Sequence, residues 1–494
     1  MNVFSWVNDY DDITNDKTFN GSLNLNWNIN KYFSYSLRAG GNIVVNDRKR
    51  WYGIQLPPGE NVKGLLAISN VNKSNYTVEN LLNFNMDLTK DFRLSATAGI
   101  TYDEYHFLTE NVSGNTFSIY DLRTKGLSNA GKVDVKQPIQ KDYQLLSYLG
   151  RVNLSAYDKY LLTASLRADG SSKFKKGNRW AYFPSFSLAW RMEQEAYMKS
   201  IDWLSQLKVR VGYGETGNQG IDPYKFVPTM SQVEKKDVAW LVNGAKPLTL
   251  NAPGLVSDSF TWETVETLDF GFDITALNGR LQSTFDWYRR DTKDMLAPGA
   301  ELPSVVGASA PLQNTADLRT KGWELSLTWR DRIGAWGYNV GFNLYDSKTV
   351  VTKYHNESKI ILKSDGTNNY YEGYEIGSIW GYVTDGYYTA DDFEDTNTWK
   401  LKEGVVTVDG VSPRPGDIKY QNLRDDGSST NRIDTGDGTF DNPGDRKIIG
   451  NNSLRLQYGI NLGVNYKGFD LSVLLQGVGT VSYTHLTLPT ICSV

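Results

Sequence analysis

The sequence is poor in cysteine, histidine, methionine and proline. The only cysteine is Cys492, so the rest of the chain has neither a disulfide framework nor a cysteine metal site. The three histidines, His106, His355 and His485, form no cluster that would supply metal ligands or a general base. We therefore expect no catalytic residue, no metal site and no cofactor, and we predict that the chain is not an enzyme.

Charge and hydropathy exclude two further classes of protein. A net charge of −4 gives no basic field for phosphate backbones, so we expect no nucleic-acid partner. Apolar runs such as residues 64–68 are far shorter than the ~18 residues of a membrane-spanning helix. A membrane crossing would have to be made by strands.

The first ten residues have no basic region followed by an apolar one, so a signal peptide is lacking and we expect a truncated envelope protein.

Aromatic residues, glycine and strict alternation dominate what is present. The chain has 30 Tyr, 14 Trp and 45 Gly, a composition typical of strands and turns. Apolar residues alternate with Asn, Ser, Arg, Asp, Gln and Gly over many segments, the pattern of strands with two different faces. We predict an all-β, antiparallel protein of about fourteen strands. The hairpins are 23–29 with 33–39, 84–88 with 92–100, 152–156 with 162–166, 268–274 with 281–287, 323–329 with 336–342 and 456–464 with 469–475, and the single strands are 186–190 and 207–213.

Two features favour a transmembrane β-barrel over a soluble sandwich or propeller. The polar residues between the apolar ones would suit a water-filled lumen, while Leu, Val, Phe and Trp face lipid. Connections also alternate between tight turns near 30, 90, 158, 279 and 467 and long segments at about 46–77, 103–146, 215–265, 291–320 and 347–453. Outer-membrane barrels have short periplasmic turns and long external loops. Aromatics beside the tight turns would form an interfacial girdle: Tyr32, Phe92, Tyr157, Tyr160, Tyr466 and Phe469.

A long block of the sequence resembles the SusC/RagA family of TonB-linked outer-membrane transporters. The block reads RADGSSKF at 167–174, GNRW at 177–180 and FPSFSLAW at 183–190. Further matching stretches follow in the family's order: GNQ at 217–219, WY at 287–288, DTKDML at 291–296, KGWEL at 321–325, GSIWGY at 377–382, PGDI at 415–418, DRKIIGN at 445–451, GFDLSV at 468–473 and QGV at 476–478.

The resemblance implies a 22-stranded barrel with an N-terminal plug in the outer membrane of a Gram-negative cell. It also implies TonB-dependent import of oligosaccharides or peptides, with a SusD-like lipoprotein and the TonB–ExbB–ExbD complex as partners. A siderophore or cobalamin receptor, a passive porin and a non-transporting surface adhesin remain alternatives. Lys175 departs from the family, which usually has Gly there.

Both ends of the chain depart from this pattern. We expect the plug and some early strands to be missing before Met1, because about fourteen strands fall short of the family's number. We therefore expect residues 1–480 to be a partial barrel. Its inherited register would leave strand edges open near Leu23 and Leu475, so no functional pore is expected. Residues 481–494 lack the family's continuation and are expected to be a non-native tail derived from a sequencing adaptor.

Local motifs add no firm site. The segment 212–217 matches a dinucleotide-binding glycine pattern, but turn residues rather than a helix follow it. The acidic stretch 417–445 resembles a calcium loop, yet Arg424 stands at a ligand position, so calcium binding is left open there. Substrate contacts are expected from aromatic residues of the long loops, without a commitment to individual side chains: Tyr370, Tyr371, Tyr374, Tyr387 and Tyr388.

Overall fold

The computed structural model describes most of the chain. The described residues are 3–230, 232–233, 241–247, 249–251, 253–257, 260–299, 302–306, 310–354, 360, 370–395, 398–408, 410–424 and 431–480. The expected tail at 481–494, with Cys492 and His485, lies outside them, as do His355 and residues 425–430 of the acidic stretch. Within the described residues, no helix is long and apolar enough to span a bilayer.

The chain forms two compact units, each of which is mainly antiparallel sheet. Unit 1 contains residues 1–186, 217–228 and 258–262. Its elements are α1 (Val3–Asn8), β1 (Tyr10–Asn28), β2 (Phe33–Tyr52), α2 (Pro57–Glu60), β3 (Leu65–Asp87), β4 (Phe92–Phe117), η1 (Arg123–Lys125), η2 (Leu127–Asn129), β5 (Ala130–Val135), β6 (Ile139–Ala156), β7 (Tyr160–Ser171) and most of β8 (Trp180–Arg191).

Unit 2 contains residues 187–216, 229–257 and 263–494. Its long strands are most of β9 (Leu204–Asn218), β12 (Glu263–Ala276), β13 (Leu281–Pro298), β14 (Leu312–Ile333), β15 (Trp336–Lys353), β22 (Arg455–Tyr466) and β23 (Phe469–Thr480). Its short elements are η3 (Met192–Gln194), β10 (Gln232–Val233), β11 (Thr249–Leu250), η5 (Ser304–Val306), β16 (Ser378–Gly381), β17 (Thr384–Tyr387), η6 (Ala390–Asp392), β18 (Phe393–Asp395), β19 (Lys400–Leu401), β20 (Ile418–Tyr420) and β21 (Lys447–Asn451).

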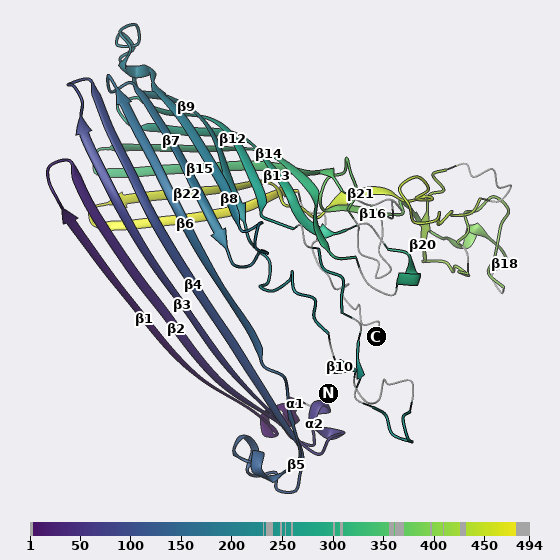
Figure 1. The fold of residues 1–494 in the computed structure, drawn as a ribbon. Coiled ribbons are helices and arrows are strands. Elements are labelled where there is room, and N and C mark those ends of the chain that lie inside the picture. Colours follow the sequence, from purple (N-terminus) through teal and green to yellow (C-terminus); the bar gives the residue numbers. More distant parts are fainter. Residues whose placement is uncertain are drawn as a thin grey trace. The chain divides into compact units, whose positions relative to one another are not determined.

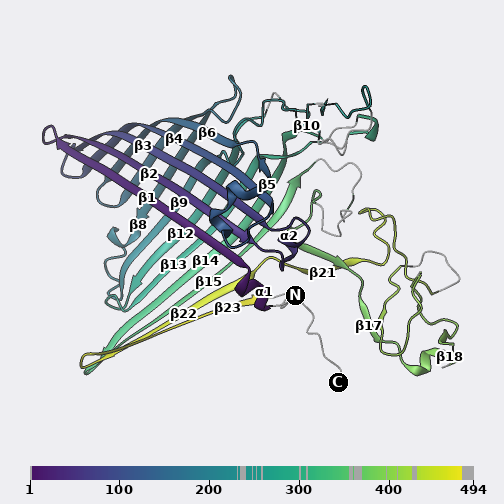
Figure 2. The same cartoon turned by 90° about the horizontal axis from the view of Figure 1, so that it is seen from below.

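The strand order follows the chain order, as expected for a series of hairpins. Among the described residues the main sheet runs β1-β2-β3-β4-β6-β7-β8-β9-β12-β13-β14-β15-β22-β23, and β5 pairs with β4 outside this path. Figures 1 and 2 show β1, β2, β3 and β4 side by side in unit 1. The all-β antiparallel fold and the fourteen strands of this path confirm the prediction. The short strand β5 was not predicted from the sequence.

The tight turns lie where the sequence placed them. The strands β1 and β2 are joined at 29–32, β3 and β4 at 88–91, and β22 and β23 at 467–468. In the turn between β12 and β13, Leu277, Asn278 and Gly279 have φ angles of 55°, 57° and 82°. Asn and Gly are the residues that adopt positive φ most readily, and the sequence supplies them at two of these three positions.

The strands are longer than the sequence pattern indicated. The predicted loops at 46–77 and 103–146 are wrong in extent, because β2 continues to Tyr52, β3 begins at Leu65, β4 continues to Phe117 and β6 begins at Ile139. Beyond an apolar band both faces of a sheet meet water, so alternation fades while backbone pairing continues. The segments therefore looked like loops although they are hydrogen-bonded strands.

In each unit the sheet has one polar face and one apolar face. In unit 1 the apolar face bears Leu82, Ala98 and Leu166, and in unit 2 it bears Phe285 and Leu325. Large apolar side chains on these faces remain exposed, as Leu23 at 60% and Leu471 at 65% show. Such exposure is expected of a surface that contacts lipid.

Conventional cores occur at the ends of the long strands and among the short ones. In unit 1, Trp51, Leu66 and Phe117 are buried together where β2, β3 and β4 end, away from the tight turns. In unit 2 a second cluster forms among the short strands, from Tyr388, Phe393, Val406 and Ile433. These two cores hold the loop segments in a defined structure.

Candidate functional site

The polar face of unit 1 is a network of cross-strand hydrogen bonds. Thr97 donates to Asn83 at 2.9 Å, and Ser165 and Ser185 contact each other at 2.6 Å. These side chains satisfy one another in a way that suits a surface facing water. Arg151 is also on this face, since it lies opposite Thr97 in the register of β4 and β6.

Further from the tight turns, the same face carries a cluster of aromatic and lysine side chains. Tyr105 on β4 lies opposite Tyr143 on β6, and the two rings are stacked with centroids 5.1 Å apart. The ammonium of Lys173 lies 4.2 Å from the centre of the Tyr143 ring, and that of Lys73 lies 5.7 Å from the Phe107 ring. We call these five residues and Lys141, which is opposite Phe107, the aromatic–lysine cluster.

The carboxylate of Asp222 lies beside the positive charges of Lys141 and Lys173 in the cluster. Lys141 donates to Asp222 at 2.6 Å, and this bond is the main cause that holds the pKa of Asp222 below its usual value. Lys173 donates to the carbonyl of Gln219 at 3.2 Å. Burial lowers the pKa of Lys173, because a desolvated ammonium is less stable.

The cluster has the chemistry of a ligand platform. Stacked tyrosine rings offer flat surfaces to apolar faces of sugars and to side chains, and lysines offer hydrogen-bond donors. The sequence did not single out Tyr105, Phe107 or Tyr143, because all three were assigned to a loop. The cation–π contacts of Lys73 and Lys173 join residues far apart in the sequence, so no local pattern could have shown them.

The longest family-like block serves a structural role in unit 1. Phe174 is fully buried, and the centroid of its ring lies 6.0 Å from that of Phe260 and 5.2 Å from that of Trp262. The indole of Trp262 donates to the carbonyl of Arg179 at 2.7 Å, and the ring of Phe183 packs against it at 5.7 Å. The block thus ties residues 172–180, beside the aromatic–lysine cluster, to the segment 260–262.

Comparison with known proteins identifies the family. The family model described as TonB dependent receptor-like, beta-barrel, matches residues 2–409. The chain belongs to the TonB-dependent receptor β-barrel family. The family consists of outer-membrane receptors and transporters rather than enzymes, and no plug is evident among the described residues.

Individual relatives confirm the resemblance to SusC and RagA. The chain is 30% identical to TonB-dependent receptor P3 of Formosa agariphila over 87% of this chain and 41% of that protein. It is 28% identical to TonB-dependent receptor SusC of Bacteroides thetaiotaomicron over 67% of this chain and 31% of that protein. The solved RagAB peptide transporter matches with a TM-score of 0.75 at 19% identity, over 94% of this chain and 47% of that one. The chain therefore spans less than half the length of these relatives.

In this TonB-dependent receptor barrel, the loop tyrosines expected to contact substrate divide into two groups. Tyr371 is buried against the rings of Tyr374 and Phe440, and burial raises its pKa. Tyr388 is also buried, and its hydroxyl donates to the carbonyl of Val406 at 2.7 Å. These side chains support the loop structure. Tyr370 and Tyr387 are exposed, at 48% and 65%.

The described part of the acidic stretch 417–445 uses its carboxylates as backbone acceptors. Asp445 is fully buried and accepts the amides of Leu423, Arg424 and Asp434 at 2.7 to 2.9 Å. Asp437 accepts the amide of Thr439, at 2.9 Å. These bonds account for the acidic residues as loop supports. Calcium binding by this stretch stays a sequence-based hypothesis.

The other motifs find structural explanations. The glycine pattern at 212–217 lies inside β9, so no helix N-terminus faces a phosphate there. His106 lies between Glu104 and Asp142, with ring nitrogens 3.2 and 3.3 Å from their carboxylates. Over the described part of the chain, no group of three His, Cys, Asp or Glu side chains could hold a metal ion.

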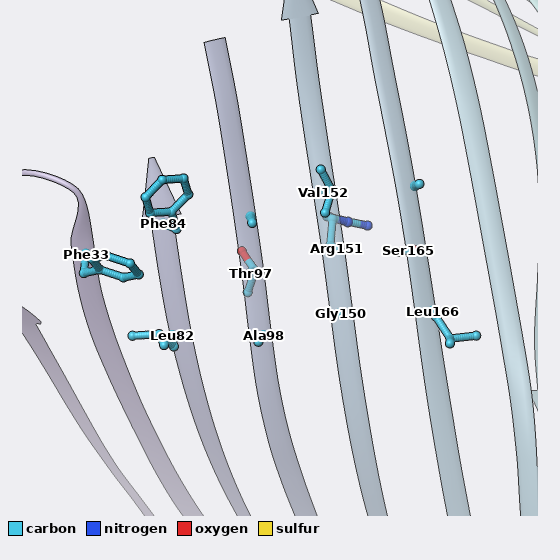
Figure 3. A pocket seen from close by; sticks show the side chains of 12 residues that line it. Phe33, Leu82, Phe84, Thr97, Ala98, Gly150, Arg151, Val152, Ser165 and Leu166 are labelled. Carbon is cyan, nitrogen blue, oxygen red and sulfur yellow. The ribbon is translucent and has the colours of Figure 1, made fainter. Parts of the chain in front are cut away.

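The apolar face of unit 1 carries a shallow groove of about 540 Å³. Figure 3 shows Phe33 and Phe84 on one side of it and Leu166 on the other, with Ala98 and Gly150 between them. Small side chains on the central strands create the hollow between larger ones. Because the groove lies on the apolar face, it is separate from the aromatic–lysine cluster on the polar face.

Proposed function

We propose that the protein imports oligosaccharides or peptides across the outer membrane of a Gram-negative cell in a TonB-dependent way. The family match over residues 2–409 is the observation that carries this proposal. The similarity to SusC and to a solved peptide transporter supports the substrate classes. The two-faced sheet supports membrane insertion, since apolar side chains would meet lipid and polar ones a lumen.

The partners proposed for the whole protein are a SusD-like surface lipoprotein and the TonB–ExbB–ExbD complex. Within this chain, the aromatic–lysine cluster is the proposed contact for substrate. It lies on the polar face, beside the middle of β4 and near the start of β6, away from the tight turns and therefore toward the external side in a barrel of this kind. A passing sugar or peptide would stack on Tyr105 and Tyr143.

Uptake measured in the host tests this function. Deletion of the encoding gene should abolish uptake of one labelled oligosaccharide or oligopeptide, and loss of TonB should have the same effect. Uptake that persists without TonB would indicate a passive porin. Loss of ferric-siderophore or cobalamin uptake instead would indicate the other receptor class, and unchanged uptake with lost surface attachment would indicate an adhesin.

Substitutions in the cluster test the site. Replacement of Tyr105 and Tyr143 by Ala should weaken substrate binding roughly two- to tenfold per ring, because a stacked ring contributes ~1 kcal/mol. The matched control is Tyr182→Ala. Tyr182 is exposed at 65%, and it lies on the opposite face of β8 from the polar-face residue Ser185, because the two are three residues apart along the strand. Equal effects of the two changes on uptake would contradict the assigned site.

A further inference from the structure

Three cations form a row across neighbouring strands on the apolar face of unit 2. Arg289 on β13 lies opposite Lys321 on β14, and Lys321 lies opposite Lys348 on β15. Figure 1 shows these strands side by side. All three residues share their face with Phe285 and Leu325, because they follow at even spacing along the strands. Like charges directly opposite one another destabilise a sheet, so the row favours a bound anion.

Nearby carboxylates neutralise this positive charge only in part. Asp291 accepts from Arg319 at 2.6 Å and lies 3.2 Å from the guanidinium of Arg289, so two cations share one carboxylate. Lys348 contacts Glu375 at 2.6 Å. On the side of the row toward the tight turn, Asp346 lies opposite Trp323 and is paired with Arg455, which also lies 3.3 Å from Glu375. On the side away from the turn lie the pair Lys293–Glu266 and the carboxylate of Asp317.

Lys321 is the centre of the unbalanced charge. Its side chain is exposed, and among the residues that the structure describes it has no carboxylate partner. Its two cross-strand neighbours are both cations. An anion at this position would contact all three positive groups.

The level of the row places it at the edge of the apolar band. One step toward the tight turn, Trp287 lies opposite Trp323, followed by Phe285 opposite Leu325. Ten residues of β15 separate Asp346, which lies opposite Trp323, from Trp336 at the turn. At ~3.3 Å per residue and a tilt of ~40° this gives a height of ~25 Å from the turn to the tryptophan level, and the row lies one step further out. This is the height of the apolar band of an outer-membrane barrel. Tryptophans at its edge are typical of the membrane interface.

We propose that Arg289, Lys321 and Lys348 bind the phosphate of an anionic glycolipid headgroup in the outer leaflet. The proposal rests on the membrane location given above, and it adds a lipid site on the outside of the sheet. The guanidinium of Arg289 supplies a planar pair of donors and the two lysines supply point charges, a combination suited to phosphate. The acyl chains of the same lipid would lie along Trp287 and Trp323.

Lipid binding to the reconstituted protein tests this site. The protein is placed in nanodiscs of neutral lipid, and binding of diphosphorylated lipid A is compared with that of its dephosphorylated form. Lys321→Gln should weaken binding of the phosphorylated lipid about fivefold, and the triple change R289Q, K321Q and K348Q on the order of 100-fold, since each basic group near a lipid surface contributes about 1 kcal/mol. Higher salt should reduce the difference.

The controls separate the site from general charge and from folding. The double change K17Q and K49Q removes two exposed lysines from β1 and β2 whose cross-strand partners Val45 and Ile13 are apolar, and it should leave lipid binding unchanged. Equal loss in this control, or unchanged binding in the triple variant, would overturn the site. Free inorganic phosphate that binds as tightly as the lipid would overturn the assignment to a headgroup. Failure of the unmodified protein to insert, seen as the absence of heat-modifiable migration, would instead overturn the membrane location.

Discussion

The turn between β12 and β13 depends on single backbone angles. Gly279 has a φ of 82°, and a Cβ added there would meet no atom within 4 Å. Space is therefore available for a side chain, but the backbone conformation disfavours one. A Cβ added at Gly150 on β6 would also meet no atom within 4 Å, and the φ of Gly150 is not positive. The two glycines thus differ in backbone conformation, while neither position is crowded.

We expect Gly279→Ala to destabilise the folded state by about 1 kcal/mol, because alanine at positive φ is strained. Gly150→Ala should be close to neutral. Urea unfolding of the two variants in detergent, followed by heat-modifiable migration, measures both effects. An equal loss at the two positions would contradict the role assigned to the positive φ of Gly279.

Among the short elements, η6 is held by a capping box. The amide of Thr389 donates to the carboxylate of Asp392 at 2.7 Å, and this bond is the main cause that holds the pKa of Asp392 below 3.8. Lys419 lies 3.5 Å from the same carboxylate and lowers its pKa further. Because the folded-state pKa is depressed, the carboxylate stabilises this element above its unfolded pKa. The stabilisation is lost as the pH falls through the lower, folded value.

Acidification below about pH 3.8 should therefore loosen the segment around η6. Pepsin, which is active in this range, should cleave beside Phe393 faster as the pH decreases from 4 to 2. The variant Asp392→Asn has no titrating group at this position but keeps an acceptor oxygen. Its rate of cleavage beside Phe393, normalised to the rate at another loop, should not show the same increase as the pH decreases. Parallel pH profiles for both proteins would mean that another group controls this loop.

At the scale of the whole molecule, the alternation of faces implies a lipid side and a water side. Leu327 on β14 lies opposite Ser283 and Phe342 on the apolar face of unit 2. The preceding residue, Ser326, lies opposite Thr284 and Asn343 on the polar face. The two positions are adjacent in sequence, so their environments differ only through the direction of the side chain.

We expect Leu327→Lys to destabilise the protein in lipid by roughly 2–4 kcal/mol, the cost of a cation near the middle of a bilayer. Ser326→Lys should be tolerated, because its ammonium would remain hydrated. Equilibrium unfolding in lipid vesicles compares the two directly. If the lysine were tolerated at 327 and disruptive at 326, the assignment of the faces would have to be reversed.

The sequence alone was sufficient for the number and order of the long strands, for the tight turns and for the two faces. Side-chain direction has a period of two residues in a strand, so a segment between lipid and water records both environments in its own order of residues. The segments around Phe84 and Leu462 show this plainly, and the turn at Asn278 and Gly279 needs only local backbone preferences. The family motifs likewise fixed the relationship to SusC and RagA.

The candidate sites required the tertiary structure. Lys173 meets Tyr143, and Lys321 lies between two other cations, only because pairing brings distant segments together in a defined register. That register depends on turn lengths and bulges, such as the shift between Thr292 and Met295, which alternation within one strand does not specify. The ends of β2 and β4 were missed for a related reason, since strands surrounded by water need no apolar pattern. The sequence thus determined which face each side chain occupies, and the pairing of strands decided which side chains meet on that face.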